Sequence, residues 1–271
     1  MILTENVKDY CLKRRTAFAA AAAKEQPKLA VLQAGEAGTA EIMKWKAACE
    51  QIGIYFEWYY FEEDITDEEL AQEIKDLEEY VDGIVVRIPS MSREIRTAIE
   101  LKKDVDGANP FGRHHSSMIS GIMQYLAHAG FVFEGAHVVI FDKSEEFGEP
   151  LGIRMGRMGA TVSLCDEGPR NRWDFIETAD LIITTMGLNC YAIHVPVIDV
   201  TGKCINTENR KVIGAKDVKE LSVIGLVDNL MVATSLRDNL EFVPCKAADC
   251  QCTFDCVKFA ECALNGTWKP E

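Results

Sequence analysis

The first hundred residues alternate between two hydrophobic patterns. Runs of consecutive apolar residues, which are typical of buried strands, occur at Lys28–Ala34, Ile54–Phe61 and Ile84–Ile88. Segments with helical composition or spacing surround these runs, at Glu5–Lys24, at Thr39–Ile52, from Thr66 and from Ser92. Strands that alternate with helices predict a parallel sheet covered on both faces.

A second alternation follows the Gly-, Asn- and Pro-rich loop Asp106–Gly112. It begins with a predicted helix, Ser116–Ala129. The strand, helix, strand and strand that we expect next are His137–Phe141, Gly148–Met158, Ala160–Cys165 and Ala179–Thr185. This βαβ order is typical of dinucleotide-binding domains. The pattern therefore predicts an α/β fold with two domains, the second of Rossmann type, and a boundary near residues 110–120.

Charge and composition exclude two classes of partner. The 271 residues include 29 Lys and Arg against 43 Asp and Glu, a formal charge of −14, which argues against nucleic-acid binding. No apolar stretch approaches the roughly 20 residues that span a bilayer, so we expect no membrane association. Charged residues within Met1–Arg15 replace the apolar core of a signal peptide, and we expect a cytoplasmic protein.

Ten cysteines divide into two groups. Five are scattered among apolar residues, where buried thiols are the simplest interpretation. Four of the others, in the spacing C-x4-C-x-C-x3-C, are Cys245, Cys250, Cys252 and Cys256. Their number suits zinc or an iron–sulfur cluster, but the spacing matches no common site and helical packing explains part of it. We therefore predict no metal site and keep these four thiols as the alternative.

The loop Asp142–Pro150 follows the first strand of the second domain and leads into a helix, where backbone amides favour a pyrophosphate. The GxGxxG fingerprint is absent, and three glutamates in the loop would repel phosphate unless they point outward or a cation intervenes. Asp166 follows the next strand, 22 residues after Ser144, at the spacing of a carboxylate that binds ribose hydroxyls. A solvated turn residue is the alternative for Asp166. Gly187, after the third strand, is a further candidate contact of the cofactor.

Several segments together resemble a known family. The pieces PKLAVLQAG, KAACEQIGI, VDGIVVRIP, KDVDGANP and ATVSLCDEG, in this order, resemble the bifunctional methylenetetrahydrofolate dehydrogenase/methenyltetrahydrofolate cyclohydrolase family. The resemblance implies two α/β domains around a cleft. Residues 1–115 would form the catalytic and folate-binding domain, joined by a C-terminal helix at about 245–271. Residues 116–244 would form the NAD(P)-binding domain.

The resemblance also assigns roles to individual residues. Asp106, which taken alone belongs to a charged turn, matches the aspartate that holds the pterin ring. Ser144, Gly148 and Pro150 match the end of the GRSxxVGxP cofactor loop. Asp142 and Lys143 replace its first glycine and its arginine. The family's His-Ser pair corresponds to Asp166-Glu167, which favours NAD over NADP.

Departures from the family pattern fall at functional positions. An ungapped comparison places Glu41 and Trp45 at the tyrosine and lysine of the Tyr-x-x-x-Lys motif. Lys44 and Lys46 flank Trp45 by about 100° on a helix, so they are candidate catalytic residues besides Asp106. Arg87 replaces the glutamine of VQLP and, with Pro89, is a candidate substrate contact. The loop that closes over the folate is replaced by Pro244–Thr253.

We therefore expect an oxidoreductase that transfers hydride from 5,10-methylenetetrahydrofolate to NAD, with NADP less favoured. Cyclohydrolase activity should be weak or absent, because it moves protons and the lysine is displaced. A homodimer is expected from the resemblance alone. One alternative is a divergent paralogue that binds a ligand or metal without folate chemistry. Another is oxidoreduction of a different substrate, whose carboxylate Arg87 would bind.

Overall fold

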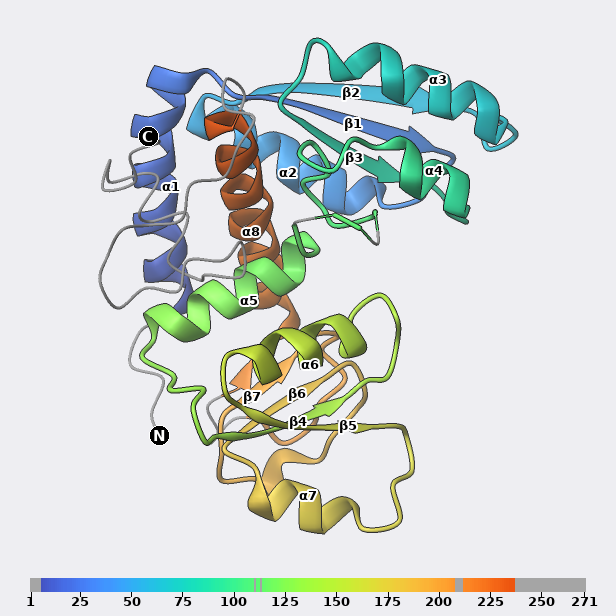
Figure 1. The fold of residues 1–271 in the computed structure, drawn as a ribbon. Coiled ribbons are helices and arrows are strands. Elements are labelled where there is room, and N and C mark those ends of the chain that lie inside the picture. Colours follow the sequence, from blue (N-terminus) through green and yellow to red (C-terminus); the bar gives the residue numbers. More distant parts are fainter. Residues whose placement is uncertain (1–5, 110, 113, 208–211, 237–271) are drawn as a thin grey trace. The chain divides into compact units, whose positions relative to one another are not determined.

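A computed structural model describes residues 6–109, 111–112, 114–207 and 212–236 (Figure 1). The chain forms two compact units, which we call the three-stranded and the five-stranded unit after their sheets. The three-stranded unit comprises Leu12–Ser120 and the chain from Val223, and the five-stranded unit comprises the chain up to Cys11 and Gly121–Ser222. Every strand pair in both sheets is parallel. The predicted α/β class with two domains is confirmed.

The three-stranded sheet has the order β2-β1-β3. Its strands are β1 (Lys28–Ala34), β2 (Tyr55–Phe61) and β3 (Gly83–Arg87). Two helices, α3 (Asp67–Glu78) and α4 (Arg93–Ala98), pack their apolar residues on one face, against side chains that include Leu32 and Ile84. The helix α2 (Thr39–Ile52) lies on the other face (Figure 1). Alternate residues of β3 therefore point to different helices, and Arg87 points to α2.

Local signals in the sequence explain where these helices begin and end. Thr66 caps α3 through its side chain, and Glu69 completes the capping box, as predicted. The side chain of Ser92 accepts a hydrogen bond from the amide of Ile95 at the start of α4. Gly53 ends α2 with φ of 90°, a left-handed conformation that favours glycine.

The five-stranded sheet has the order β5-β4-β6-β7-β8. Its strands are β4 (His137–Phe141), β5 (Thr161–Cys165), β6 (Leu181–Thr184), β7 (Val197–Asp199) and β8 (Val212–Ile213). The helix α6 (Gly148–Arg157) covers one face and α7 (Arg172–Thr178) the other (Figure 1). Gly152 lets α6 approach the sheet, since a Cβ there would lie 3.0 Å from Leu164.

The remaining elements are long helices and one short turn of helix. They are α1 (Val7–Glu25), α5 (Ser117–His128), α8 (Ala215–Ser235) and the 3-10 helix η1 (Cys190–Ala192). At Gly121, α5 touches α8 so closely that a Cβ would lie 1.9 Å from the carbonyl oxygen of Leu221. Within the described ranges, no helix combines the length and apolar character needed to cross a membrane. The four clustered cysteines, Pro244–Thr253 and the predicted helix 245–271 lie outside the described residues.

Candidate active site

Each sheet has one place where polar side chains can gather above the strands. In the three-stranded sheet, β1 lies between β2 and β3. After β1, the chain therefore adds β2 on one side of β1 and later adds β3 on the other side. In the five-stranded sheet, β4 lies in the same way between β5 and β6. Ligands of parallel α/β sheets bind at the carboxyl ends of the strands at this switch point. Lys44 and Lys46 lie on α2, which follows β1, and the other predicted substrate and cofactor residues lie at or beyond the carboxyl ends of β3, β4, β5 and β6.

Arg87, the last residue of β3, is held by three neighbours in the three-stranded unit. Its Nη2 lies 2.5 Å from Oδ2 of Asp106, and its Nε donates to Oε2 of Glu41 at 3.1 Å. Its guanidinium carbon lies 4.8 Å from the centre of the Trp45 ring. Burial would lower the pKa of Arg87, but the two carboxylates outweigh it and raise the pKa above its usual value. The guanidinium is therefore permanently charged and fixed in direction.

The loop after residue 103 presents Asp106 to this arginine. The amide of Ser117, at the start of α5, donates to Oδ1 of Asp106 at 2.8 Å. Asp104 is fully buried and accepts the amides of Ala108 and Asn109, within the same loop, at 3.0 and 2.7 Å. Burial raises the pKa of Asp104 to about 6, although these amides oppose the shift. Asp104 thus builds the loop and Asp106 faces the site.

Asn229 of α8 also holds this loop in place. Its amide nitrogen donates to the carbonyl oxygens of Val105 and His115, at 2.8 and 3.0 Å. Val105 directly precedes Asp106, and His115 lies two residues before Ser117, whose amide donates to Asp106. The position of the Asp106 carboxylate is therefore fixed by helix α8 as well as by its own neighbours in sequence.

The two candidate lysines lie on either side of the buried Trp45. Lys44 is exposed, and Lys46 is half-buried with its Nζ 4.0 Å from Oε1 of Glu50. Trp45, not a lysine, contacts Arg87 from this turn of α2. Pro89 is exposed two residues beyond Arg87. Of the predicted residues in this unit, the structure thus brings together Arg87 and Asp106.

In the five-stranded unit, Asp142 organises the loop before α6. Its Oδ1 accepts the amides of Ser144 and Gly148, at 2.6 and 3.2 Å, and the hydroxyl of Ser144 at 2.5 Å. Its Oδ2 accepts the hydroxyl of Thr185, which follows β6, at 2.6 Å. Burial raises the pKa of Asp142, but these hydrogen bonds outweigh it and lower the pKa below its usual range. The Asp142 carboxylate thus accepts hydrogen bonds from amides at and just before the start of α6.

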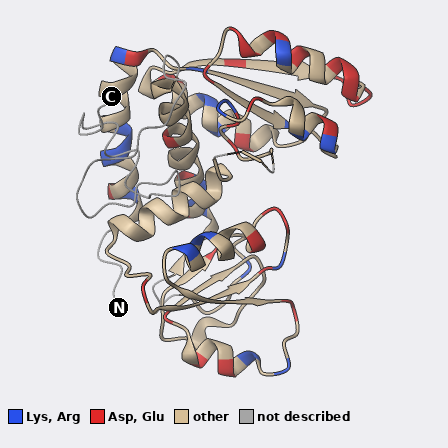
Figure 2. Ribbon diagram, in the orientation of Figure 1, with Lys and Arg blue, Asp and Glu red and all other residues tan. Residues whose placement is uncertain are grey.

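The tight turn into α6 requires glycine. A Cβ at Gly148 would lie 2.2 Å from the carbonyl oxygen of Asp142, so any side chain there would displace the loop. Pro150 falls in the first turn of α6, where its missing N–H is tolerated. The loop carries both acidic and basic residues (Figure 2).

Lys143 and Asp166 lie together beside this turn. The Nζ of Lys143 is 3.4 Å from Oδ2 of Asp166, and both side chains are more than half exposed. They follow β4 and β5, so the pair stands at the carboxyl ends of two adjacent strands. Gly187, in the loop after β6, is exposed. These groups suit a dinucleotide: a carboxylate for ribose hydroxyls, a lysine for a phosphate, and a turn that has no room for a side chain.

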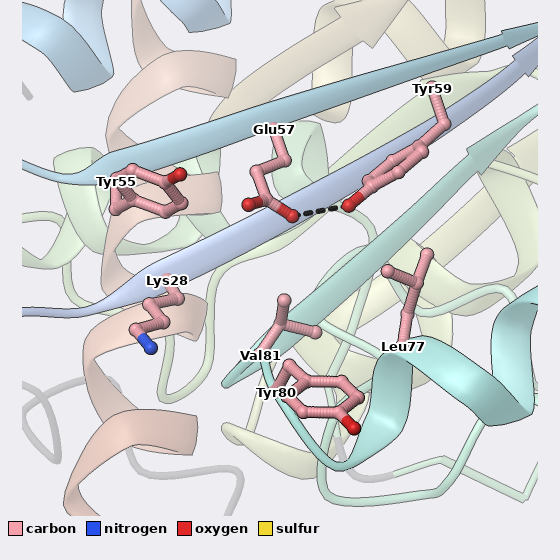
Figure 3. Close-up of a pocket in the computed structure, with 7 residues that line it drawn as sticks. All are labelled: Lys28, Tyr55, Glu57, Tyr59, Leu77, Tyr80 and Val81. Atoms are coloured by element: carbon pink, nitrogen blue, oxygen red, sulfur yellow. Dashed lines mark hydrogen bonds between the residues drawn. The ribbon is translucent and has the colours of Figure 1, made fainter.

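A hollow of roughly 510 Å³ lies at the opposite edge of the three-stranded sheet (Figure 3). Its lining comes from the start of β1, from β2, and from the end of α3 with the residues after it: Lys28, Tyr55, Glu57, Tyr59, Leu77, Tyr80 and Val81. The hydroxyl of Tyr59 donates to Glu57, and that bond, with burial, raises the pKa of Tyr59 to about 12. No predicted site residue lines this hollow. Across the described residues, no three His, Cys, Asp or Glu side chains gather closely enough to hold a metal ion.

Comparison with known sequences relates both units to one enzyme family. Residues 3–106 match the catalytic domain of tetrahydrofolate dehydrogenase/cyclohydrolase, and residues 116–227 match its NAD(P)-binding domain. The chain belongs to the tetrahydrofolate dehydrogenase/cyclohydrolase family. The predicted family is thereby confirmed, and the two matches together include every residue predicted to contact the substrate or the cofactor.

Two relatives illustrate how far the similarity reaches. The bifunctional protein FolD of Nitrosomonas europaea is 31% identical over 179 residues, which cover 60% of this chain and 61% of that protein. FolD of Bacillus cytotoxicus is 33% identical over 178 residues, with 59% and 62% covered. The matched stretch thus spans about three fifths of the length of these curated relatives.

Solved structures of the family share the fold. FolD methylenetetrahydrofolate dehydrogenase/cyclohydrolase from Campylobacter jejuni superimposes with a TM-score of 0.78 at 23% identity, covering 85% of this chain and 98% of that one. The 5,10-methylenetetrahydrofolate dehydrogenase of the silkworm Bombyx mori gives 0.75 at 21% identity, covering 86% and 97%. At these identities the likeness establishes the fold alone.

Some residues that hold the family site here were not predicted. Ser117 and Asn229 fix Asp106 and its loop, and Thr185 fixes Asp142. Thr185 ends a predicted strand, so its place beside Asp142 at the switch point could have been inferred from the strand order. Asn229 lies 124 residues from its acceptor Val105, and no local pattern marks it.

Proposed function

We propose that this protein is a methylenetetrahydrofolate dehydrogenase that prefers NAD and has weak or no cyclohydrolase activity. The observation that carries the proposal is Asp106, held as a fixed acceptor at the carboxyl edge of the three-stranded sheet in a chain of this family. A carboxylate accepts the paired N–H donors of an amide-like heterocycle such as the pterin ring. The reduced folate is therefore the expected substrate.

The dinucleotide is assigned to the turn between β4 and α6. When bound, the cofactor supplies the hydride acceptor, so no acid or base of the protein is required for that transfer. Asp166 is in position to accept the ribose hydroxyls of NAD and to repel the additional phosphate of NADP. Among the described ion pairs, Asp166 pairs with Lys143. The Asp166 carboxylate supports the preference for NAD.

The cyclohydrolase reaction needs proton transfers, for which the family uses a lysine. In the ungapped comparison Trp45 falls at the position of that lysine, and the positive charge beside Trp45 belongs to Arg87, whose pKa is raised. A group that stays protonated is a poor proton shuttle. We therefore expect dehydrogenase activity without efficient hydrolysis of the methenyl product.

The two other functions considered have less support. A substrate carboxylate would have to compete with Glu41 and Asp106 for Arg87, whose Nη1 also donates to the carbonyl oxygen of Val86 at 3.2 Å. A paralogue without folate chemistry finds no support in the comparisons. The homodimer and the cytoplasmic location remain predictions.

Calorimetric titration of the purified chain with NAD, NADP and tetrahydrofolate tests the proposal. Methylenetetrahydrofolate is then added to the same sample, and NADH is followed by its absorbance. Binding of NAD and folate with NADH formation is the expected result, and omission of either compound is the control. Accumulation of the methenyl product would identify the weak hydrolase step. Failure to bind either ligand would refute the proposal.

A further inference from the structure

We propose that Arg87 is the positioning residue for the Asp106 carboxylate, and that Glu41 and Trp45 of α2 act on the substrate only through Arg87. This inference rests on the proposed folate function of the same site. It makes four side chains from α2, β3 and the loop after residue 103 a single unit, in which only Asp106 touches the folate.

The hydrogen bonds of Asp106 define what it can still accept. The Ser117 amide takes one lone pair of Oδ1, and Nη2 of Arg87 takes one of Oδ2. A carboxylate offers about four lone-pair sites, so one further donor can approach each oxygen. The two donors also fix the plane of the carboxylate. The result is a pair of acceptors with a set spacing and direction, as two adjacent N–H groups of a heterocycle require.

Arg87 can impose this geometry only if its own side chain is held. A free arginine samples many rotamers, which would move Asp106 with it or release it. Glu41 and Trp45 are four residues apart and thus share one face of α2. Glu41 binds Nε and the Trp45 ring lies against the guanidinium, while Nη1 donates to the carbonyl oxygen of Val86. Nη2 is therefore left pointing at Asp106.

The burial of the two carboxylates that contact Arg87 agrees with these roles. Asp106 is 6% exposed at its side chain, and a buried carboxylate needs a positive partner to remain ionised at low cost. Arg87 supplies that charge to Asp106 and to Glu41 at once. Glu41 is 37% exposed and is held by the arginine at the rim, so its loss should matter less than that of Arg87.

The test compares four substitutions with the wild type by calorimetric titration with tetrahydrofolate and, separately, NAD. Arg87→Gln removes the positive charge and the branched set of guanidinium donors. Arg87→Lys keeps the positive charge alone, and Glu41→Gln removes the more exposed of the two carboxylates. The fourth is the double variant Glu41→Gln/Arg87→Gln. Arg93→Gln, an exposed arginine on α4, is the matched control.

We expect Arg87→Gln to weaken tetrahydrofolate binding by roughly tenfold to a hundredfold, the range for a hydrogen bond to a charged group. Affinity for NAD should stay within about twofold, because the dinucleotide turn belongs to the other unit. Arg87→Lys should recover part of the loss. Glu41→Gln should cost roughly threefold to tenfold, and the double variant should bind no more weakly than Arg87→Gln alone.

Three results would overturn the inference. Wild-type affinity in Arg87→Gln would show that Asp106 needs no support. Equal loss of folate and NAD would show a general structural role. Additive losses in the double variant would show that Glu41 acts independently of Arg87. If the wild type itself binds no tetrahydrofolate, the proposed function fails first, and the inference fails with it.

Discussion

Each of the two units has a carboxylate near the carboxyl ends of its strands, and the two carboxylates are held by different means. At the three-stranded sheet, Asp106 is held chiefly by a side chain, Arg87, which is held in turn by α2. At the five-stranded sheet, Asp142 is held by backbone amides and by hydroxyls. Side-chain pairs can be exchanged by mutation, whereas amides are present in any sequence that makes the turn. The first edge is therefore the place where this chain can depart from its family without losing the fold.

Substitution of Asp106 should have the largest effect, because it should abolish the function of one edge and spare the other. Asp106→Ala removes the acceptors for the heterocycle and leaves Arg87 with Glu41 alone, so tetrahydrofolate affinity should fall by on the order of a hundredfold. NAD binding should persist, since Asp142 and its turn are unchanged. Calorimetry with both ligands measures this. Asp64→Ala, at an exposed aspartate of the same unit, is the control. A parallel loss of NAD binding would argue against separate sites.

The pH dependence of stability should have opposite signs at the two edges. Burial raises the pKa of Asp104 from its usual 3.8 to about 6, so its contribution to stability is full below about pH 4 and is lost as pH rises through 6. The lowered pKa of Asp142 means that its contribution is present above about pH 4 and is lost as pH falls. The shift of Asp104 corresponds to at most about 3 kcal/mol.

Denaturant unfolding of the wild type, Asp104→Asn and Asp142→Asn between pH 4 and 7 measures these contributions. The destabilisation caused by Asp104→Asn should shrink as pH rises. That caused by Asp142→Asn should grow over the same range. Two curves with the same slope would mean that burial and hydrogen bonding do not separate the aspartates in this way.

Removal of the acceptor at the five-stranded sheet should lower stability without affecting the folate. Asp142→Ala leaves the amides of Ser144 and Gly148 without their acceptor, at an expected cost of about 2 kcal/mol in the free energy of unfolding. Asp142→Asn keeps an acceptor oxygen and should cost about half as much near pH 7. Chemical denaturation measures both variants. Unchanged stability in Asp142→Ala would show that solvent replaces the carboxylate.

The smallest expected effect concerns the choice of dinucleotide. Asp166→Ser removes the carboxylate beside Lys143, so NAD should bind roughly tenfold more weakly and NADP more tightly. Titration with both dinucleotides gives the ratio of the two affinities. Glu177→Ser, at an exposed glutamate of α7, is the matched control. An unchanged ratio would remove Asp166 from the ribose site.

The sequence predicted most of the fold because apolar runs and turn residues coincide. The predicted strands at Lys28–Ala34 and His137–Phe141 have the observed bounds, and the helix at Thr39–Ile52 does as well. Five elements were not predicted: α7, η1, β7, β8 and α8. The strands β7 and β8 have three and two residues, too few for a pattern. The helix α8 is buried on most sides, so it lacks the polar stripe that marks an amphipathic helix.

The site was predictable in position but not in its contacts. The carboxyl end of a predicted strand located the loop that begins with Asp142, and the family resemblance singled out Asp106, before their surroundings were known. The Arg87 pairs could not be derived, because Glu41 and Asp106 lie in different segments and their meeting depends on rotamers. The structure also places Trp45, rather than Lys44 or Lys46, against the arginine. A helical period alone left that choice open.

The two aspartates of the KDVDG segment have a consequence for anyone who engineers this loop. Asp104 holds the loop together and Asp106 is the proposed substrate contact, although the two aspartates are only two positions apart. A graft of the segment onto another α/β protein would carry the recognition group but leave behind Asn229, which braces the loop from a helix far along the chain. A transplanted loop therefore needs a substitute brace before it can display its carboxylate in the same direction.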